Sequence, residues 1–389
     1  MAHRSCAQHP ASYRLNYDPT LRRKTPLAHI LGDRIRRQGP IRIDDYMSAC
    51  LWDPQYGYYA TRQPLGAAGD FVTAPEISQI FGELIGLWAT VVWRDWLGRP
   101  QPFTLAELGP GRGTLMRDML RATATIPGFH ANLHCQLVEA STPLIAAQKS
   151  TLSQCGVPMS WGPNMSGARA PAIVIAHEFF DAMPLDQWVK SERGWARRSV
   201  ELDDNCELQF ATHPTTSMRP DLDQRFPDAA IGAISESQRP EVILGDIGAL
   251  NHVGPVVALI IDYGHEKTTS NDTLQAVRQH QHEHPLTSPG EADLSAQVDF
   301  EELAAEARKV GLVADGPITQ AEFLGRLGII ERASKLMAAN PQKAASIETD
   351  VARLLAPNGM GTRFKVLALR TPSVPSLPGF DVPRQDITK

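Results

Sequence analysis

Short apolar runs recur along the chain at the spacing expected of strands in a layered protein. Five of them have the length and unbroken apolar character of buried parallel strands: Phe103–Leu108, Cys135–Val138, Ala172–Ala176, Val256–Ile261 and Phe364–Leu369. Residues 114–124, which follow the first run, carry apolar positions at helical spacing. Alternation of this kind implies βαβ units with right-handed crossovers. We therefore expect an α/β fold with a Rossmann-like, doubly wound sheet.

Residues 26–98 are expected to form a helical N-terminal region before the first strand. Thr73 and Glu76 have the spacing of a capping box, with Pro75 in the first helical turn. The following apolar residues recur at helical spacing as far as Gly98: Ile77, Ile80, Phe81, Leu84, Ile85, Trp88, Val91 and Val92. The pattern predicts one long helix that begins at Thr73.

The remaining segments divide into a core, its insertions and two tails. The core spans residues 99–371, and large insertions follow its fourth and fifth strands. The first insertion, 185–254, contains a hairpin-like stretch; the second, 266–350, looks largely helical and polar, with helices at Phe300–Val310 and Ala321–Met337. Residues 1–25 and the proline-rich residues 372–389 are expected to be loose tails, disordered or draped over the surface.

Charge and hydropathy exclude several classes of partner. The formal net charge is -5, so nothing indicates general attraction to nucleic acid or to an anionic membrane surface. The longest apolar run, Leu84–Trp93, stops at Arg94, far short of the ~20 residues that span a bilayer. We expect no nucleic-acid partner and no membrane insertion.

The cysteines and the N-terminus bear on the compartment. Five scattered cysteines without a C-x-x-C pair form neither a zinc site nor a disulfide framework, which favours a reducing, intracellular location. A cytoplasmic location is the simplest interpretation. The N-terminal 25 residues carry five basic side chains and lack the apolar core of a secretory signal, so a mitochondrial transit peptide, and with it the matrix, is the alternative.

A glycine-rich turn between the first strand and its helix is the main candidate for a cofactor site. Glu107 is followed by Gly109, Gly111 and Gly113, and position 114 is threonine, so the dinucleotide pattern G-x-G-x-x-G is not met. Glycines let the backbone approach a ligand at a helix N-terminus, where free N–H groups favour an anion. The turn suits the carboxylate of a methionine moiety, with Glu107 near its positively charged groups.

Glu139 strengthens this prediction. It follows the second strand, 26 residues after Gly113, where an acidic side chain can accept both ribose hydroxyls of a nucleoside. Taken singly, a glycine-rich turn occurs in many α/β proteins, and a glutamate after a strand is usually only solvated. The glycine-rich turn and Glu139 together, at this spacing, favour an S-adenosylmethionine site.

Several longer motifs resemble those of one family, the MidA-like methyltransferases, which include the mitochondrial complex I assembly methyltransferase. The resemblance extends in order from about residue 26 to residue 370, and Gly69–Glu83 is its longest and most specific block. It rests further on these segments: Glu107–Thr114, Glu178–Pro184, Asp262–Gly264, Asp272–Ala276, Pro289–Asp293, Val298–Phe300, Met360–Gly361 and Phe364–Val366.

The resemblance implies a class I S-adenosylmethionine-dependent methyltransferase. Its mitochondrial relatives methylate an arginine of a partner protein during respiratory complex assembly, so it also implies a protein substrate, with a respiratory complex subunit as the candidate. The chain departs from the family pattern at His177, where asparagine is expected, and at Ser237–Pro240, where the family is usually more apolar. These departures bear on the substrate, and His177 stays with the residues expected at the cofactor.

Acidic residues after the next strands are the catalytic candidates. His177, Glu178 and Asp181 follow the third run and Asp262 follows the fourth, at the strand ends where ligands of such sheets bind. The sequence His-Glu-Phe-Phe-Asp lacks the Asn/Asp-Pro-Pro-aromatic signature of DNA amino-methyltransferases. Carboxylates suit a guanidinium, which needs bidentate contacts for its orientation. The alternative is structural: Asp181 caps a turn and Glu178 bonds backbone amides.

Three further features carry hypotheses. Asp70, at the tip of the glycine-rich 66–71 loop, is expected at the cofactor or its entrance as part of a lid. Tyr56, Tyr58 and Tyr59 form either an aromatic wall over the cofactor or ordinary packing. His280, His282 and His284 alternate, but no second cluster completes a metal site, so a solvated loop is expected and no metal.

Two other functions remain open at this point. A small-molecule N- or O-methyltransferase would use the two insertions as a lid over an enclosed pocket. A cofactor-binding assembly factor with little turnover would instead expose a large apolar patch for a partner. The sequence does not identify the methyl acceptor, the methylation state or the oligomeric state.

Overall fold

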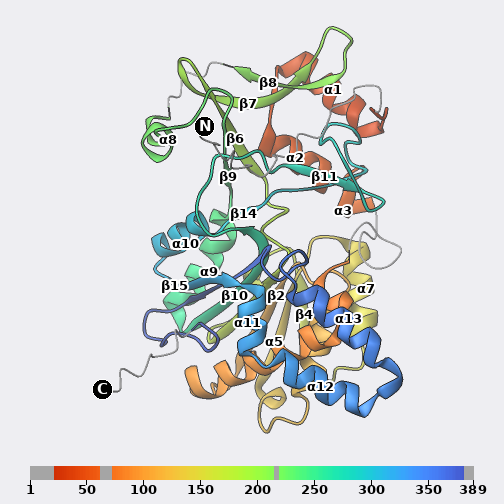
Figure 1. Ribbon diagram of the computed structural model, residues 1–389, viewed down its shortest axis with the longest axis vertical. Coiled ribbons are helices and arrows are strands. Elements are labelled where there is room, and N and C mark those ends of the chain that lie inside the picture. The colour runs from red at the N-terminus through yellow and green to blue at the C-terminus, as the bar shows by residue number, and fades with distance from the viewer. Residues whose placement is uncertain (1–21, 62–71, 214–218, 381–389) are drawn as a thin grey trace, which may run out of the picture.

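The lower half of the molecule in Figure 1, which we call the lower lobe, contains a sheet in which seven strands lie side by side. The five expected strands are among them. In the computed structural model, which describes residues 22–61, 72–213 and 219–380, strands β2, β3, β4, β5 and β10 run parallel, and β16 is antiparallel to both neighbours. The order across the sheet is β15 (Val313–Thr319), β16 (Phe364–Arg370), β10 (Val256–His265), β5 (Ala172–His177), β2 (Phe103–Leu108), β3 (Leu133–Val138) and β4 (Met159–Gly162).

The strand order reverses between β2 and β5. From β2 the chain moves outward through β3 and β4, then returns to β5 on the other side of β2 and continues to β10. Loops that leave β2 and β5 therefore diverge from neighbouring strand ends and leave a crevice at the carboxyl edge of the sheet. The expected doubly wound α/β fold is confirmed, and the crevice falls on the predicted cofactor residues.

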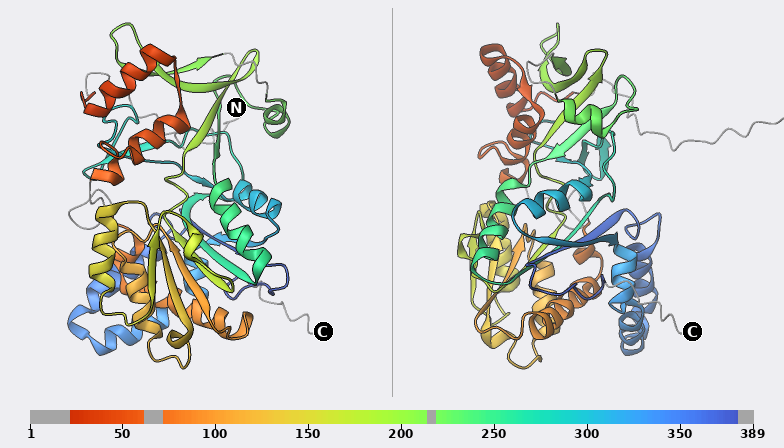
Figure 2. Two further views of the ribbon diagram at one scale, coloured as in Figure 1. Left: turned by 180° about the vertical axis from the view of Figure 1, so that it is seen from behind. Right: turned by 90° about the vertical axis from the view of Figure 1, so that its left-hand side faces the viewer.

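Helices cover both faces of this sheet, because alternate residues of each buried strand point to opposite sides. One face packs against α5 (Gln79–Val91), α6 (Thr114–Thr123) and the C-terminal helices α11 to α13. The other packs against α9 (Glu241–Val253) and α10 (Phe300–Lys309), as the two sides of Figure 2 show. Around the strands lie α7 (Thr142–Leu152), the π-helix η2 (Val92–Trp96), and the 3-10 turns η3 (His130–Asn132) and η4 (Met165–Gly167).

The upper lobe joins the start of the chain to both insertions (Figure 1). It contains α1 (Pro26–Gln38), β1 (Ile41–Arg42), α2 (Ile43–Trp52), α3 (Tyr58–Thr61), β6 (Leu185–Ser191), β7 (Gly194–Leu202), β8 (Leu208–His213), α8 (Pro220–Arg225) and β9 (Ile234–Gln238). The expected hairpin is β6–β7, within an antiparallel sheet of order β1-β7-β6-β9 on which β8 also pairs with β7. A separate core packs α1 and α2 against this sheet.

The second insertion is less helical than expected. It adds a small sheet of β11 (Gln275–Arg278), β12 (Gln281–Glu283) and β13 (Asp293–Ser295), and it includes β14 (Val298–Asp299) and the core strand β15. The predicted helix at 300–310 is α10. The predicted helix at 321–337 is broken into α11 (Gln320–Arg326) and α12 (Ile329–Ala339), because Gly328 takes a positive φ of 83° between them. The 3-10 turn η5 (Pro341–Lys343) and α13 (Ala344–Leu355) follow.

A helix begins directly after Thr73 as predicted, but the capping box and the single long helix do not form. A short helix, α4 (Ala74–Ile77), ends at Ser78, whose hydroxyl accepts the N–H of Ile80 and starts α5. Thr73 makes no side-chain capping bond. Glu76 accepts the hydroxyl of Thr114 at 2.6 Å instead of reaching back to Thr73. The N–H of Ala74 donates to the carboxylate of Glu178, so a residue distant in sequence replaces the local cap.

Two expected tails are partly ordered. Thr25 caps α1 and its hydroxyl donates to the carbonyl of Pro289, so residues 22–25 are fixed. Residues 372–380 are not loose either, because Leu377 is buried and Trp88 donates to the carbonyl of Pro378 at 2.9 Å. Apolar side chains between the prolines anchor this segment on α5. Within the described ranges, no helix has the length and apolar character needed to cross a membrane.

Candidate cofactor and methyl-acceptor site

A cavity of about 380 Å³ lies at the carboxyl ends of β2, β3, β4 and β5, below the upper lobe. The turn after β2, the loops after β3 and β4 and the segment 177–184 after β5 line it, and α2, α3 and α9 complete its walls. Of the predicted site residues, Glu107, Gly109, Gly111, Glu139, His177 and Glu178 line this cavity. The switch point of the sheet thus brings the predicted cofactor residues and one acidic catalytic candidate into one pocket.

The glycine-rich turn has the backbone conformation that the sequence predicted. Gly109, Gly111 and Gly113 have φ angles of 60°, 54° and 80°, a region that favours glycine. A Cβ on Gly109 would stand 2.9 Å from the Phe179 ring, so this residue must also be small. Gly113 differs from the other two, because it lies off the cavity lining, against Gln148 of α7, and precedes the first residue of α6. Its positive φ is what requires glycine, since an added Cβ would make only ordinary contacts at 3.5 Å with Gln148 and Leu152.

Glu107 presents a buried carboxylate to the cavity. Its Oε2 atom has no hydrogen-bond partner among the described residues. Burial raises the pKa of Glu107 to about 8, because the ionised form loses its hydration. A cationic group placed here would restore the charged form. The ammonium group of a methionine moiety meets this requirement.

Glu139 is held in one orientation. Its Oε1 accepts the backbone N–H groups of Ala140 at 2.9 Å and Ser141 at 2.8 Å, and Gln148 donates to its Oε2 at 3.2 Å. Burial raises the pKa of the Glu139 carboxyl. Gln148 also donates to the carbonyl of Gly111 at 2.9 Å, so one buried amide joins the glycine turn to Glu139. Gln148 was not predicted, since a glutamine inside an amphipathic helix gives no local signal.

Two aromatic rings from the upper lobe form a wall of the cavity. Trp52 and Tyr59 stack with their centroids 4.7 Å apart, and the hydroxyl of Ser141 donates to the Tyr59 carbonyl at 2.7 Å. Of the three tyrosines considered, only Tyr59 lines the cavity in the described structure; Tyr58 is buried and Tyr56 packs at the edge of the upper core. Trp52, at the end of α2, was not predicted. Neither was Asn164, which follows the missed strand β4 and also lines the cavity.

His177 and Glu178 lie together at the end of β5. The His177 Nε2 and Glu178 Oε1 atoms are 3.4 Å apart, and in the described part of the chain neither has a hydrogen-bond partner. Burial lowers the pKa of His177 to about 3, so its ring is neutral near pH 7. The Glu178 side chain is only 19% exposed, and burial, followed by the charge of Asp181, raises its pKa to about 8. Glu178 has the positive φ of 49° that marks a constrained backbone.

Asp262 does not stand in the cavity as predicted. Its carboxylate is fully buried and is used by the backbone: Oδ2 accepts the N–H groups of Phe179, Phe180 and Asp181 at 3.0–3.2 Å, and Oδ1 accepts that of Tyr263. The four donors leave no face for a substrate. The structural alternative weighed for Glu178 applies to Asp262, which organises the turn after β5.

Asp181 lies behind the cavity lining and not on it. The carboxylate is buried and accepts a hydrogen bond from the Tyr263 hydroxyl, and burial raises its pKa to about 6. Its charge acts on Glu178 and on Tyr59, as does that of Asp293 at the start of β13. Asp181 therefore has an electrostatic influence on the cavity but no place on its wall.

The polar segment 237–240 is held in place by hydrogen bonds to neighbouring elements. Ser237 donates to Glu302 at 2.9 Å, and Gln238 donates to the carbonyl of Phe180 at 3.0 Å. The Arg239 backbone N–H donates to the carbonyl of Pro184 at 3.2 Å, and Arg239 is one of the residues that line the cavity. This segment supports the turn after β5 from the side opposite Asp262.

The remaining hypotheses concern a lid and a metal. Asp70 lies outside the described residues. No group of histidine, cysteine, aspartate and glutamate suited to a metal ion occurs in ranges 22–61, 72–213 and 219–380. His284 accepts the backbone N–H of Leu286, while His280 and His282 are exposed.

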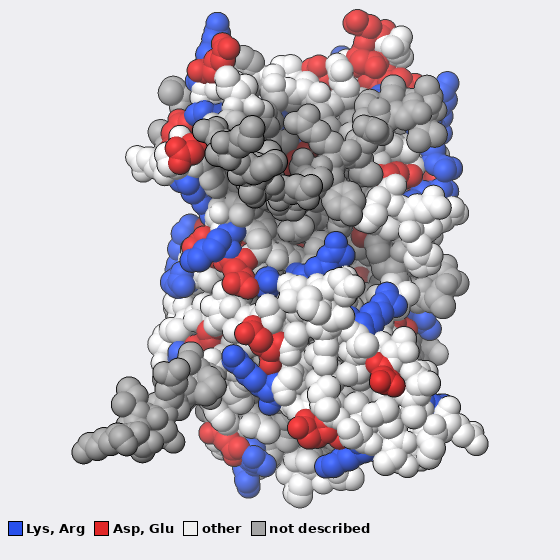
Figure 3. Space-filling view, viewed as in Figure 1, with Lys and Arg blue, Asp and Glu red and all other residues white. Residues whose placement is uncertain are grey.

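Basic and acidic side chains alternate over the described part of the face in Figure 3, without a continuous basic surface.

Comparison with known proteins agrees with this site. Residues 84–318 match the family described as "putative S-adenosyl-L-methionine-dependent methyltransferase". Protein arginine methyltransferase NDUFAF7 of Rattus norvegicus is 35% identical and the Drosophila melanogaster homologue 37%; the matches cover 89% and 88% of this chain and 84% of each relative, and both are named mitochondrial. A Burkholderia thailandensis protein, described as a "likely methyl transferase" and solved with S-adenosyl-homocysteine, superposes with a TM-score of 0.80 and 26% identity, over 91% of this chain and 94% of that one.

Proposed function

The chain belongs to the family of S-adenosyl-L-methionine-dependent methyltransferases, and on that premise we propose that it methylates an arginine of a partner protein, with Glu178 as the acceptor-binding carboxylate. The relatives are named protein arginine methyltransferases, which supports a protein substrate. The one observation that carries the proposal is that Glu178 lines the cavity while its buried Oε1 atom has no hydrogen-bond partner in the described chain.

The residues at the glycine turn fit S-adenosylmethionine. We assign Glu107 to its ammonium group, the backbone of Gly109 and Gly111 to its carboxylate, and Glu139 to its ribose hydroxyls. When bound, this cofactor supplies an electrophilic methyl group. The protein has to hold the accepting nitrogen in line with that group and to exclude water, so alignment supplies much of the acceleration.

A guanidinium is the methyl acceptor that best fits the part of the cavity around Glu178. Glu178 has no lysine or arginine ion-pair partner in the described residues. The His177 ring lies 3.4 Å from the Glu178 carboxyl group, but burial keeps this ring neutral. A buried carboxylate of this kind is costly unless a cation pairs with it. An arginine side chain that enters the cavity would restore the ionised form of Glu178 and gain charge-assisted hydrogen bonds.

The same carboxylate can take the proton that methylation releases. As the new carbon–nitrogen bond forms, the guanidinium nitrogen must lose one N–H proton to keep its positive charge at one. Glu178, once ionised by the bound guanidinium, is the carboxylate that lines the cavity and can accept this proton. Asp181 and Asp262 then serve Glu178 indirectly, the first through its charge and the second by fixing the turn.

Tritiated S-adenosylmethionine tests this function directly. The purified protein is incubated with a lysate of its source organism, and labelled proteins are identified by mass spectrometry of their peptides. Label on an arginine nitrogen supports the proposal, and Glu178→Gln should lose that label while binding S-adenosylhomocysteine normally. Label found only in the small-molecule fraction would instead identify a small-molecule methyltransferase.

The identity of the partner and the compartment belong to the same proposal. We propose a respiratory complex subunit as the target, on the resemblance set out above. We propose a cytoplasmic location for the chain. The mitochondrial matrix is the alternative location, and the mitochondrial names of the relatives are the argument for it. The labelled protein in the lysate experiment identifies the target. Imaging of the full chain with a C-terminal fluorescent tag in source cells identifies the compartment.

A further inference from the structure

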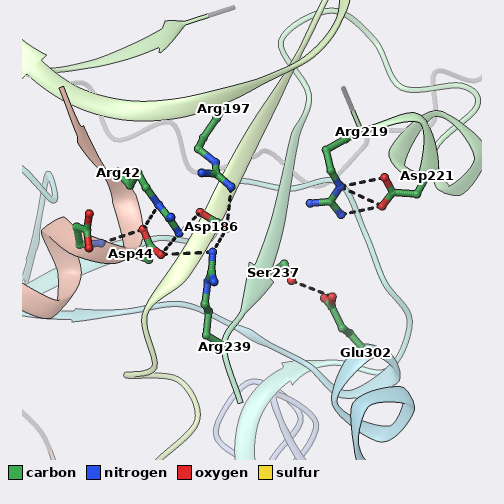
Figure 4. Close-up of polar contacts among 10 residues, drawn as sticks. Arg42, Asp44, Asp186, Arg197, Arg219, Asp221, Ser237, Arg239 and Glu302 are labelled. Carbon is green, nitrogen blue, oxygen red and sulfur yellow. Dashed lines mark hydrogen bonds and ion pairs between the residues drawn. The ribbon is translucent and has the colours of Figure 1, made fainter. Parts of the chain in front are cut away.

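Three arginines converge on two aspartates beside the cavity (Figure 4). Arg42 binds Asp44 through Nε at 2.9 Å and Asp186 at 3.5 Å. Arg197 binds Asp186 at 3.4 Å, and Arg239 binds both Asp186 and, at 3.4 Å, Asp44. These five residues come from β1, α2, β6, β7 and the end of β9, so tertiary folding alone brings them together. We refer to them as the arginine cluster.

Guanidinium groups outnumber carboxylates within the arginine cluster, and the charge of the neighbouring Asp45 also acts on Arg42. The three guanidinium groups face two carboxylates, both of them only 11% exposed and both engaged by more than one arginine. The arginine side chains are 29–40% exposed. The Nε atom of Arg197 is buried and has no hydrogen-bond partner among the described residues. Each guanidinium offers five N–H donors, so donors outnumber the acceptors within the cluster.

Arg239 connects the arginine cluster to the cavity. Arg239 is among the residues that line the same cavity as Glu178, and its backbone N–H is bonded to Pro184, at the end of the segment that begins with Glu178. With Glu107 assigned to the cofactor, the cavity offers the substrate the carboxyl group of Glu178 and a half-exposed arginine, Arg239. A matching substrate carries a cation for Glu178 and an anion for Arg239.

We propose that Arg239, backed by Arg42 and Arg197, binds a carboxylate side chain of the substrate protein that lies close in sequence to the target arginine. The proposal rests on the protein-arginine function above and makes Arg239 a specificity-determining residue. A guanidinium fork matches a carboxylate in two parallel hydrogen bonds. Nucleic acid is disfavoured as the ligand, because its phosphates would approach a cavity lined by Glu76, Glu107, Glu139 and Glu178.

Binding of short peptides tests this interaction without any need for turnover. Fluorescein-labelled, capped peptides carry one arginine and either glutamate or glutamine at one of the neighbouring positions, and fluorescence anisotropy gives their Kd for the protein loaded with S-adenosylhomocysteine. The variants are Arg239→Gln and Arg239→Lys, the second of which keeps the charge. Arg219→Gln is the matched control, because the Arg219 side chain is half-buried like that of Arg239 and pairs with its own Asp221 (Figure 4).

Wild type should bind the best glutamate peptide roughly three- to ten-fold more tightly than its glutamine partner, the range for a partly exposed charge pair. Arg239→Gln should abolish this difference, Arg239→Lys should keep part of it, and Arg219→Gln should keep all of it, with thermal unfolding unchanged across the set. Equal affinities of wild type for the two peptides, no binding of either, or an undiminished difference in Arg239→Gln would overturn the proposal. Failure of the protein-arginine function is a separate result, seen as peptides that bind without becoming methylated.

Discussion

The carboxylate of Asp262 accepts the backbone N–H of Phe180 at 3.0 Å, across from the end of β10 to the turn after β5. The N–H groups on either side of Phe180 bind the same oxygen atom. The turn is thereby wrapped around one buried carboxylate, and Glu178 at its start is held with a positive φ. The direction in which Glu178 faces thus depends on a residue more than eighty positions away.

This relationship predicts a large effect of Asp262→Ala. The substitution leaves two buried and two partly buried backbone N–H groups without their acceptor, and we expect a loss of about 3–5 kcal/mol in the free energy of unfolding. Urea unfolding measures the loss. Asp33→Ala, an exposed aspartate of α1 paired with Arg36, is the control and should change stability by less than ~0.5 kcal/mol. Equal stabilities would show that the turn does not need Asp262.

Gly111→Val should abolish cofactor binding with little change in fold. Gly111 has a φ of 54°, which a branched side chain adopts only with strain, and it lines the cavity next to Glu107. Titration calorimetry with S-adenosylhomocysteine gives the affinity. Gly325→Ala in α11, where an added Cβ meets no atom within 4 Å, should bind as wild type does. Undiminished binding by Gly111→Val would move the cofactor away from the glycine turn.

Glu139→Ala should weaken binding of adenosine-containing ligands by roughly 1–3 kcal/mol, the cost of leaving two ribose hydroxyls without an acceptor. Calorimetry with S-adenosylhomocysteine and with adenosine measures the change. Free methionine, which has no ribose, should bind the variant and wild type equally. If adenosine binds both proteins equally, another residue holds the ribose.

The acceptor reaction should depend on the ionisation of Glu178. Its pKa of about 8 in the free protein means that the carboxylate is mostly protonated at pH 7. Since a guanidinium binds the ionised form, kcat/KM for the acceptor should rise as the pH increases from 6 and level off above about 8. Glu178→Gln should lower kcat/KM by about 10²–10⁴-fold and remove this rise. The exposed Glu192→Gln should keep the wild-type profile, and a rise that persists in Glu178→Gln would assign it to another group.

The two raised carboxyl pKa values also predict how stability varies with pH. Glu107 and Glu178 have folded pKa values of about 8 against 4.5 ordinarily, so between these values the folded protein binds more protons than the unfolded chain. The free energy of unfolding should therefore be highest below about pH 4.5, as far as these groups are concerned, and fall as the pH rises to 8, by at most ~1.4 kcal/mol per pH unit for each group.

Urea unfolding of the ligand-free protein between pH 6 and 8.5 measures this slope. The double variant Glu107→Gln, Glu178→Gln should show a shallower fall than wild type, because its amides do not titrate. Saturating S-adenosylhomocysteine should reduce the fall in wild type, since its ammonium group favours the ionised form of Glu107. Identical slopes in wild type and the double variant would mean that neither carboxyl group has a raised pKa.

The sequence by itself determined the central strands and the glycine turn. Strands buried on both faces need continuous apolar runs, so β2, β3, β5, β10 and β16 were visible locally. Three glycines in five positions after a strand similarly indicated a backbone with positive φ, which the structure has. Both signals depend on a residue and its immediate neighbours, which is why they can be read along the chain.

Tertiary structure alone decided which polar groups meet. The edge strands β4 and β15 are only half-buried, so their mixed patterns gave no strand signal. Glu178 and Asp262 looked alike in sequence, yet the cavity lies beside the first and the backbone amides of a distant turn surround the second. Trp52 and Arg239 reach the cavity from distant segments. A carboxylate or guanidinium takes whichever partners the packed fold brings within about 3 Å, and no local pattern records that choice.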